Sequence, residues 1–219
     1  MPKRKSIFSV LNVLLAANAA IGLAVLVTVY WTNAARAQRI DTPRIPPVQK
    51  ADWTPEQAEI LKPFESRLLN VYTTMANHPD LARDWLVFAS HVLRRSTLPA
   101  REREILILRI GWLCRSEYEW AQHVRIGREA GLTDQDIQNI MTGPSATGLK
   151  EGDRLLLQAT DELHKDSHIS DATWSALSKT YDTKQMMDIV FAVGEYNLVS
   201  MALNSFGVQL EEGLDGFPK

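Results

Sequence analysis

The chain has 219 residues, which is enough for one ordinary domain with an added segment and too few for two full-sized domains. Its hydrophobic fraction (45%) and charged fraction (23%) are close to the globular average, which excludes a disordered chain and a polytopic membrane protein. A single cysteine, Cys114, excludes an internal disulfide framework, a zinc site built on thiolates and a two-cysteine redox centre.

Charge is distributed unevenly along the chain. The formal net charge is −2, but residues 1–41 hold five of the 24 basic side chains and only one of the 26 acidic ones. The remainder of the chain is therefore acidic, and an acidic domain is poorly suited to bind a phosphate backbone. We expect no nucleic-acid partner.

The N-terminal segment predicts the location of the protein. Residues 7–31 contain no charged side chain and are long enough to span a bilayer as a helix, which takes about 20 residues. The length favours an uncleaved membrane anchor, but Ala35-Arg36-Ala37 matches a signal-peptidase site, so residues 1–37 are either an anchor or a cleaved signal. The A-x-A pattern favours a periplasmic or other extracytoplasmic domain, while basic residues at both ends of the segment leave its orientation open.

A proline-rich linker is expected at residues 38–52, followed by a folded domain at 53–219. The domain shows no alternating strand pattern and no hairpin turn, which predicts an all-α fold. Capping and periodicity predict these helices: one opened by Thr54-Pro55, then 64–76, 81–93, 99–114, 116–131, one capped by Thr133, 151–164, 170–179 and 183–206.

Two of these helices are apolar on nearly all sides, around 105–110 and within 183–206. Such helices are typical of the centre of a bundle, and they favour further burial between subunits. In the last helix, Tyr196, Ser200 and Asn204 share a face, which indicates either a wet cavity wall or a hydrogen-bond network.

The helix that begins at Ser116 carries the pattern with most chemical content. Glu119 and His123 are four residues apart and share a face, so the carboxylate can hold the imidazole and raise its basicity. Ser116 and Glu119 also fit a capping box, which would make both residues structural. If the preceding helix packs antiparallel, Glu104 approaches the same face.

Four motifs in order resemble a known family: R-x-x-E at 101–104, an I-L-R run, Y-E-W-x-x-H at 118–123 and G-L-T-x-x-x-I at 131–137. The chain resembles the carboxymuconolactone decarboxylase family within the alkylhydroperoxidase D-like superfamily, over roughly residues 64–209. The resemblance implies an alkylhydroperoxidase D-like helical bundle that assembles as a trimer or hexamer.

Peroxidases of the superfamily carry a relay glutamate and two cysteines ahead of the histidine. In this chain Glu104 stands at the relay position, while Ser116 and Glu119 stand at the thiol positions. Cys114 lies outside those positions and has no partner, so dithiol peroxidase chemistry is excluded.

The resemblance implies decarboxylation or proton transfer on a small carboxylated lactone or related cyclic acid, without a cofactor. His123 is then expected to be the acid, Glu119 its orienting group and Glu104 a relay, with Arg101 or Arg109 as the clamp for the substrate carboxylate. The residues expected to bind substrate are Arg101, Arg109, Tyr118 and Trp120. No metal is expected, because Glu119 and His123 supply only two ligands.

Two other functions remain open from the sequence. One is a membrane-tethered helical oligomer without catalysis that binds a small acid or a protein partner. The other is a hydrolase or isomerase that acts on a different ring. An opening at the Glu119/His123 face would favour an enzyme, and a face sealed by packing would disfavour it.

Overall fold

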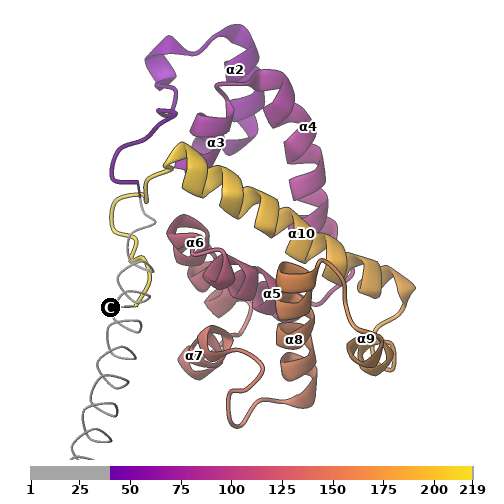
Figure 1. The fold of residues 1–219 in the computed structure, drawn as a ribbon. Coiled ribbons are helices and arrows are strands. Elements are labelled where there is room, and N and C mark those ends of the chain that lie inside the picture. Colours follow the sequence, from indigo (N-terminus) through magenta and orange to yellow (C-terminus); the bar gives the residue numbers. More distant parts are fainter. Residues whose placement is uncertain (1–39, 219) are drawn as a thin grey trace, which may run out of the picture. The chain divides into compact units, whose positions relative to one another are not determined.

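The computed structural model describes residues 40–218, which form an all-helical bundle (Figure 1). The anchor or signal predicted for residues 1–37 lies outside the described residues. No strand occurs in the described part of the chain. The helices are η1 (Lys50–Asp52), α2 (Pro55–Leu61), η2 (Lys62–Arg67), α3 (Asn70–Met75), α4 (Pro79–Ser90), η3 (His91–Arg95), α5 (Ala100–Leu113), α6 (Glu117–Glu129), α7 (Asp134–Thr142), α8 (Glu151–Asp166), α9 (Asp171–Leu177) and α10 (Thr183–Phe206).

Local capping fixes several of these boundaries. Thr54 and Thr133 form capping boxes at the starts of α2 and α7, and Asp182 forms one at the start of α10. Gly207 ends α10 in the left-handed region, at φ 70°. These ends agree with those predicted from the sequence.

The helix predicted for residues 64–76 is divided in two. Its first part is the 3₁₀ helix η2, and the extended backbone of Leu68 and Leu69 separates η2 from α3. Leucine is a good helix former, so this break is imposed by packing rather than by local propensity. The break turns the chain, and residues of both η2 and α3 line one cleft.

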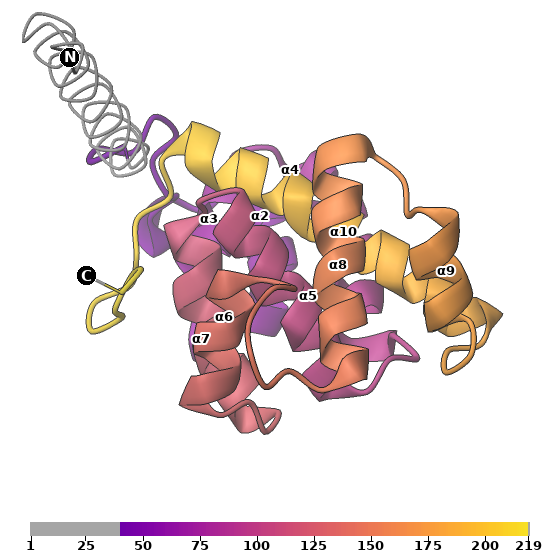
Figure 2. The ribbon, with the colours of Figure 1, turned by 60° about the horizontal axis from the view of Figure 1, so that its bottom comes forward.

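Helix α5 lies at the centre of the core, as its apolar sequence predicts. Residues 104–111 are all buried, and α5 packs against α6, α8 and α10 (Figure 2). Such a helix has no polar face to present to solvent, so any charged side chain on it needs a partner inside the protein. Glu104 and Arg109 are the charged side chains in this buried stretch.

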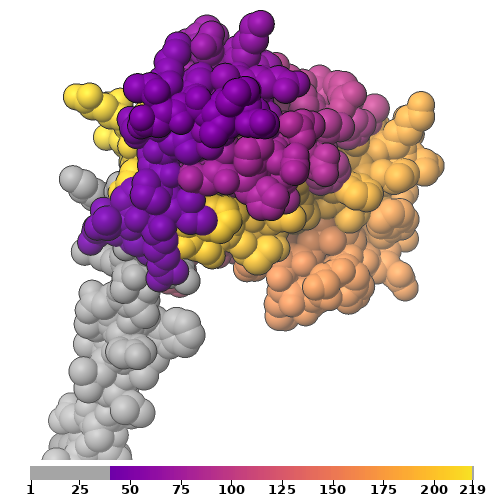
Figure 3. All heavy atoms as spheres, turned by 90° about the horizontal axis from the view of Figure 1, so that it is seen from above, coloured from indigo at the N-terminus to yellow at the C-terminus, as the bar shows by residue number. Residues whose placement is uncertain are grey.

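Helix α10 runs between two groups of helices, α2–α4 on one side and α5–α9 on the other (Figures 1 and 2). It is the one helix within residues 40–218 that is long and apolar enough to cross a membrane, and half of its apolar window is buried, as in a core helix. Part of α10 is uncovered in the view of Figure 3. Four large apolar side chains of α10 are exposed: Met187, Phe191, Leu198 and Met201.

The segment expected to be a linker is attached to the domain. The backbone N–H groups of Arg44 and Ile45 donate to the carbonyl of Phe206, and that of Val48 donates to Thr73. The compact unit accordingly begins at Ile40. The prolines of this segment give an extended chain that lies along the helices.

Candidate functional site

Glu119 and His123 lie one turn apart on α6 and face each other. Glu119 Oε1 is 2.9 Å from His123 Nε2, and both side chains are less than a tenth exposed. The spacing of four residues therefore places the two groups as the sequence predicts.

Glu104 reaches the same histidine from α5. The chain reverses after Leu113 through Arg115, which adopts φ 53°, so α5 and α6 pack against each other as a hairpin. Glu104 Oε2 is then 2.6 Å from His123 Nδ1, and its other oxygen accepts a bond from the Arg103 guanidinium at 3.2 Å. Both ring nitrogens of His123 thus contact carboxylates.

This arrangement determines the charge of His123. Burial alone lowers the pKa of His123, but the charges and hydrogen bonds of Glu104 and Glu119 outweigh burial and raise the pKa to about 10. His123 is therefore an imidazolium at neutral pH. The ring of Tyr196 meets the imidazole edge-on, with centroids 4.9 Å apart.

The capping box at the start of α6 is not formed. Ser116 is the N-cap residue, but its side chain makes no capping hydrogen bond, and its buried Oγ has no partner. The carboxylate of Glu119 turns to His123 instead. The structural alternative for Glu119 therefore does not apply.

The Glu119/His123 face opens into a cleft of about 490 Å³. Helix α6 and α10 form one wall, and η2, α3, α4 and the π-helical turn η3 form the other. A cleft of this size is typical of small-molecule sites. The face is therefore open, which distinguishes it from one sealed by packing.

Glu195 is a cleft residue that the sequence analysis missed. It projects from α10, is 3% exposed, and accepts a 2.7 Å hydrogen bond from Trp85 Nε1. Burial raises the pKa of Glu195, the Trp85 hydrogen bond lowers it, and the charge of Glu119 raises it further. The sequence does contain a signal for Glu195: it is a carboxylate within an apolar helix and has no basic residue one turn away.

Tyr118 lies in the cleft wall, as expected for a substrate-binding residue, but its hydroxyl is already occupied. The hydroxyl donates to Glu211 Oε1 at 2.6 Å and accepts from the backbone N–H of Val71. Glu211 also accepts from Gln122 Nε2 at 2.5 Å and from the backbone N–H of Asn70 at 2.7 Å. One carboxylate of the C-terminal segment thus joins α3 to α6.

Arg101 and Arg109 do not line the cleft. Arg101 makes a bidentate ion pair with Asp153 at 2.7 and 2.8 Å, and Arg109 makes one with Asp161 at 2.6 and 2.8 Å. Both guanidiniums are saturated by carboxylates of the protein, so the expected role as a clamp for the substrate does not fit their positions. Trp120 is also absent from the cleft, because its ring is buried in the core.

Other cations stand at the cleft. Arg67 on η2 and Arg94 on η3 line it, are exposed, and make no ion pair with residues 40–218. Arg125 is paired with Glu129 at 2.7 Å. The sequence analysis missed Arg67 and Arg94, because neither interrupts an apolar run and their proximity to α6 depends on how η2 and η3 pack.

Cys114 does not line the cleft. Its thiol donates to Asn197 Oδ1 at 3.0 Å, and burial raises the pKa of the thiol to about 11. A thiol with a raised pKa is a poor nucleophile. On the same side of α10, Asn204 donates to the Cys114 carbonyl, and the buried Ser200 hydroxyl interacts with the Cys114 thiol. Tyr196 thus belongs to the cleft wall, and Asn204 to a separate contact.

Within residues 40–218, no three His, Cys, Asp or Glu side chains are grouped so as to hold a metal ion.

The site can now be compared with known proteins. Residues 79–162, which contain Glu104, Glu119 and His123, match the carboxymuconolactone decarboxylase family. No curated protein matches the chain. The residues that match the family run from the start of α4 into α8.

Several solved structures share the fold of this chain. The alkylhydroperoxidase AhpD core of a peroxidase-related protein from Ralstonia eutropha JMP134 is similar at 19% identity, over 78% of this chain and 93% of that chain, with a TM-score of 0.68. A debrominase, Bmp8, in complex with 2,3,4-tribromopyrrole is similar at 15% identity (80% and 94% covered, TM-score 0.65). A peroxidase-related protein from Silicibacter sp. TM1040 is similar at 15% identity, over 80% of this chain and 92% of that chain, with a TM-score of 0.63. The chain is therefore an all-α, AhpD-like bundle.

Proposed function

We propose that this protein is an enzyme that transfers a proton on a small cyclic carboxylic acid, with decarboxylation of a carboxylated lactone as the expected reaction. The observation that carries the proposal is the Glu119–His123 pair, in which Glu119 Oε1 lies 2.9 Å from the imidazolium nitrogen Nε2 and both residues line an open cleft. The open cleft also favours an enzyme over a non-catalytic oligomer.

In the proposed mechanism Glu119 carries the transferred proton. His123 remains an imidazolium, because Glu104 at 2.6 Å holds it from behind, and it stabilises negative charge at the cleft floor. This differs from the acid role expected for His123 from the sequence, since a group with a pKa near 10 is a weak donor at neutral pH. His123 and Glu104 are then positioning residues for Glu119.

Arg67 and Arg94 are proposed to attract and hold the substrate carboxylate, in place of Arg101 and Arg109. Neither has an ion-pair partner within residues 40–218, so a substrate anion would not have to displace a protein carboxylate. A guanidinium also matches the geometry of a carboxylate. The stacked rings of Phe64 and Tyr72, 4.0 Å apart, offer an apolar wall for the ring.

The test uses the full-length protein in mild detergent with a panel of carboxylated lactones and cyclic carboxylic acids. Turnover is followed by carbon dioxide release and by NMR of solvent deuterium entering the substrate. We expect Glu119→Gln to lower turnover by about 10²–10⁴. Glu151→Gln is the matched control, because it makes the same change at an exposed site on α8.

Two results would contradict the proposal. One is wild-type turnover in the folded Glu119→Gln variant, which would remove Glu119 from the chemistry. The other is the absence of carbon dioxide release, deuterium exchange and melting shift for every member of the panel.

A further inference from the structure

Glu195 lines the same cleft as Glu119 and His123 and interacts with the charge of Glu119. It comes from α10, whereas Glu119 and His123 come from α6, and all three line the same cleft. Glu195 Oε1 accepts from Trp85 Nε1 at 2.7 Å. Glu195 Oε2 makes no hydrogen bond within residues 40–218, and it is not among their buried unpartnered atoms, so it is open to the cleft.

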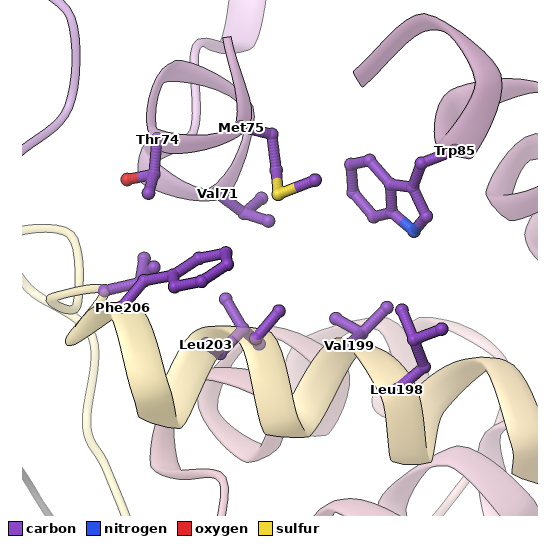
Figure 4. Close-up of a pocket in the computed structure, with 10 residues that line it drawn as sticks. Val71, Thr74, Met75, Trp85, Leu198, Val199, Leu203 and Phe206 are labelled. Carbon is purple, nitrogen blue, oxygen red and sulfur yellow. The ribbon is translucent and has the colours of Figure 1, made fainter. Parts of the chain in front are cut away.

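Trp85 is held in place by apolar packing on its other side. Its indole borders a small crevice of about 20 Å³ between α3, α4 and α10, with Val71 and Val199 among the neighbours (Figure 4). Figure 4 shows the indole nitrogen directed towards α10. The ring cannot turn away without opening this packing, so the hydrogen bond fixes the orientation of the Glu195 carboxyl group.

No basic side chain within residues 40–218 forms an ion pair with Glu195. Helix α4 contributes only uncharged residues to the cleft, and the charged residues of α6 that line it are Glu119, His123 and the paired Arg125 and Glu129. Arg94 on η3 is exposed. A buried carboxyl group opposite another carboxylate favours its protonated form. A protonated carboxylic acid can donate a proton, which an ionised one cannot.

We propose that Glu195 is the second proton-transfer residue of this site, the acid that complements Glu119, and that Trp85 positions it. This inference rests on the function proposed above. When the substrate loses carbon dioxide, the electron pair of the broken carbon–carbon bond enters the conjugated carbonyl and forms an enolate. Glu195 gives its proton to the enolate carbon and becomes a carboxylate, and the proton that Glu119 carries from water restores it.

A purely structural role explains Glu195 less well. A buried structural carboxylate normally has both oxygens paired, as Glu211 does with Tyr118, Gln122 and Asn70. Glu195 has one paired oxygen and one that opens on the cleft. Two carboxyl groups in different environments, on two helices that line one cleft, are typical of sites that divide acid and base roles.

The first test needs no substrate. The Trp85 fluorescence contribution, taken as the difference between wild type and Trp85→Phe, is followed over pH 4–8 in the full-length protein. We expect a transition with a midpoint above the ordinary glutamate value, and its loss in Glu195→Gln. A transition at the ordinary value, or one that survives in Glu195→Gln, would overturn the inference.

The second test uses the substrate panel. We expect Glu195→Gln to lower kcat by about 10²–10⁴ with KM changed by less than about threefold, because the amide keeps the Trp85 hydrogen bond but holds no acidic proton. Glu195→Asp should restore part of the activity. In Trp85→Phe, loss of a bond that favours the carboxylate should move the alkaline limb of kcat to higher pH.

The outcomes separate the two proposals. Loss of turnover in Glu119→Gln with wild-type kcat in Glu195→Gln would overturn the role of Glu195 and leave the proposed function standing. A Trp85→Phe variant whose alkaline limb does not move would remove the positioning role. Wild-type protein that processes no member of the panel would refute both.

Discussion

Replacement of Arg109 by methionine should unfold the protein more easily and leave ligand binding almost unchanged. Arg109 is 6% exposed on α5, the central helix. Its guanidinium contacts Asp161 at 2.6 and 2.8 Å and the carbonyls of Ile140 and Met141 at 2.8 and 2.9 Å. Methionine fills a similar volume but leaves the carboxylate and both carbonyls without their donors.

The structure sets the size of this effect. Removal of one partner from a buried ion pair costs about 3–5 kcal/mol. The Asp161 side chain keeps 32% of its surface exposed, so water can solvate the remaining charge and the lower end of the range applies. We therefore expect a loss of about 3 kcal/mol, which lowers Tm by about 6–12 °C in a domain of this size.

Urea unfolding followed by far-UV circular dichroism measures the loss. Arg154→Met is the control, because Arg154 forms an exposed pair with Glu151 that should contribute less than about 1 kcal/mol. The double variant Arg109→Met/Asp161→Leu should recover part of the stability, since it leaves no charge unpaired. A loss below about 1 kcal/mol together with a large rise in KM would refute this reasoning and restore Arg109 as a substrate clamp.

Three further predictions follow from features of the core and surface. Protonated His123 should contribute its full stabilisation below pH 6.5 and lose it as the pH rises towards 10, because the pKa of His123 is raised in the folded state. Urea titrations at several pH values measure this dependence, and Glu104→Gln should make the free energy of unfolding less dependent on pH over this range. Cys114→Ser should leave turnover unchanged, since the thiol lies outside the cleft. A large loss of turnover in a folded variant would contradict the assignment of this cleft as the active site. The protein should be oligomeric by light scattering, and Phe191→Asp, with Met201→Asp beside it, should dissociate it; a wild-type monomer at micromolar concentration would be inconsistent with this prediction.

The parts of the site that depend on local geometry could be predicted from the sequence. The four-residue spacing of Glu119 and His123 fixes their relation on one helix, and a short break between two helices is enough to bring Glu104 near. The limits of α10 follow from capping by Asp182 and Gly207. In each case the contact joins residues of one helix, or of two helices that are consecutive in the sequence.

The other parts depend on contacts between distant segments. The apolar run around Arg109 indicates a buried partner, but nothing local identifies Asp161, which lies 52 positions later. The cleft exists because η2 and α4 pack over α6, and only that packing sets Trp85 against Glu195, 110 positions apart. Periodicity reports which face of a helix is buried, and it does not report which other helix covers that face.

Glu211 has a consequence for the order in which the molecule forms. Its carboxylate lies after α10 near the end of the chain, yet it binds Asn70 on α3 and both Tyr118 and Gln122 on α6. The contact of α3 with α6 through this carboxylate can therefore form only after residue 211 has been synthesised. Contacts over such long separations are slow to form, so α2–α4 should be the last part to acquire protection from hydrogen exchange during refolding.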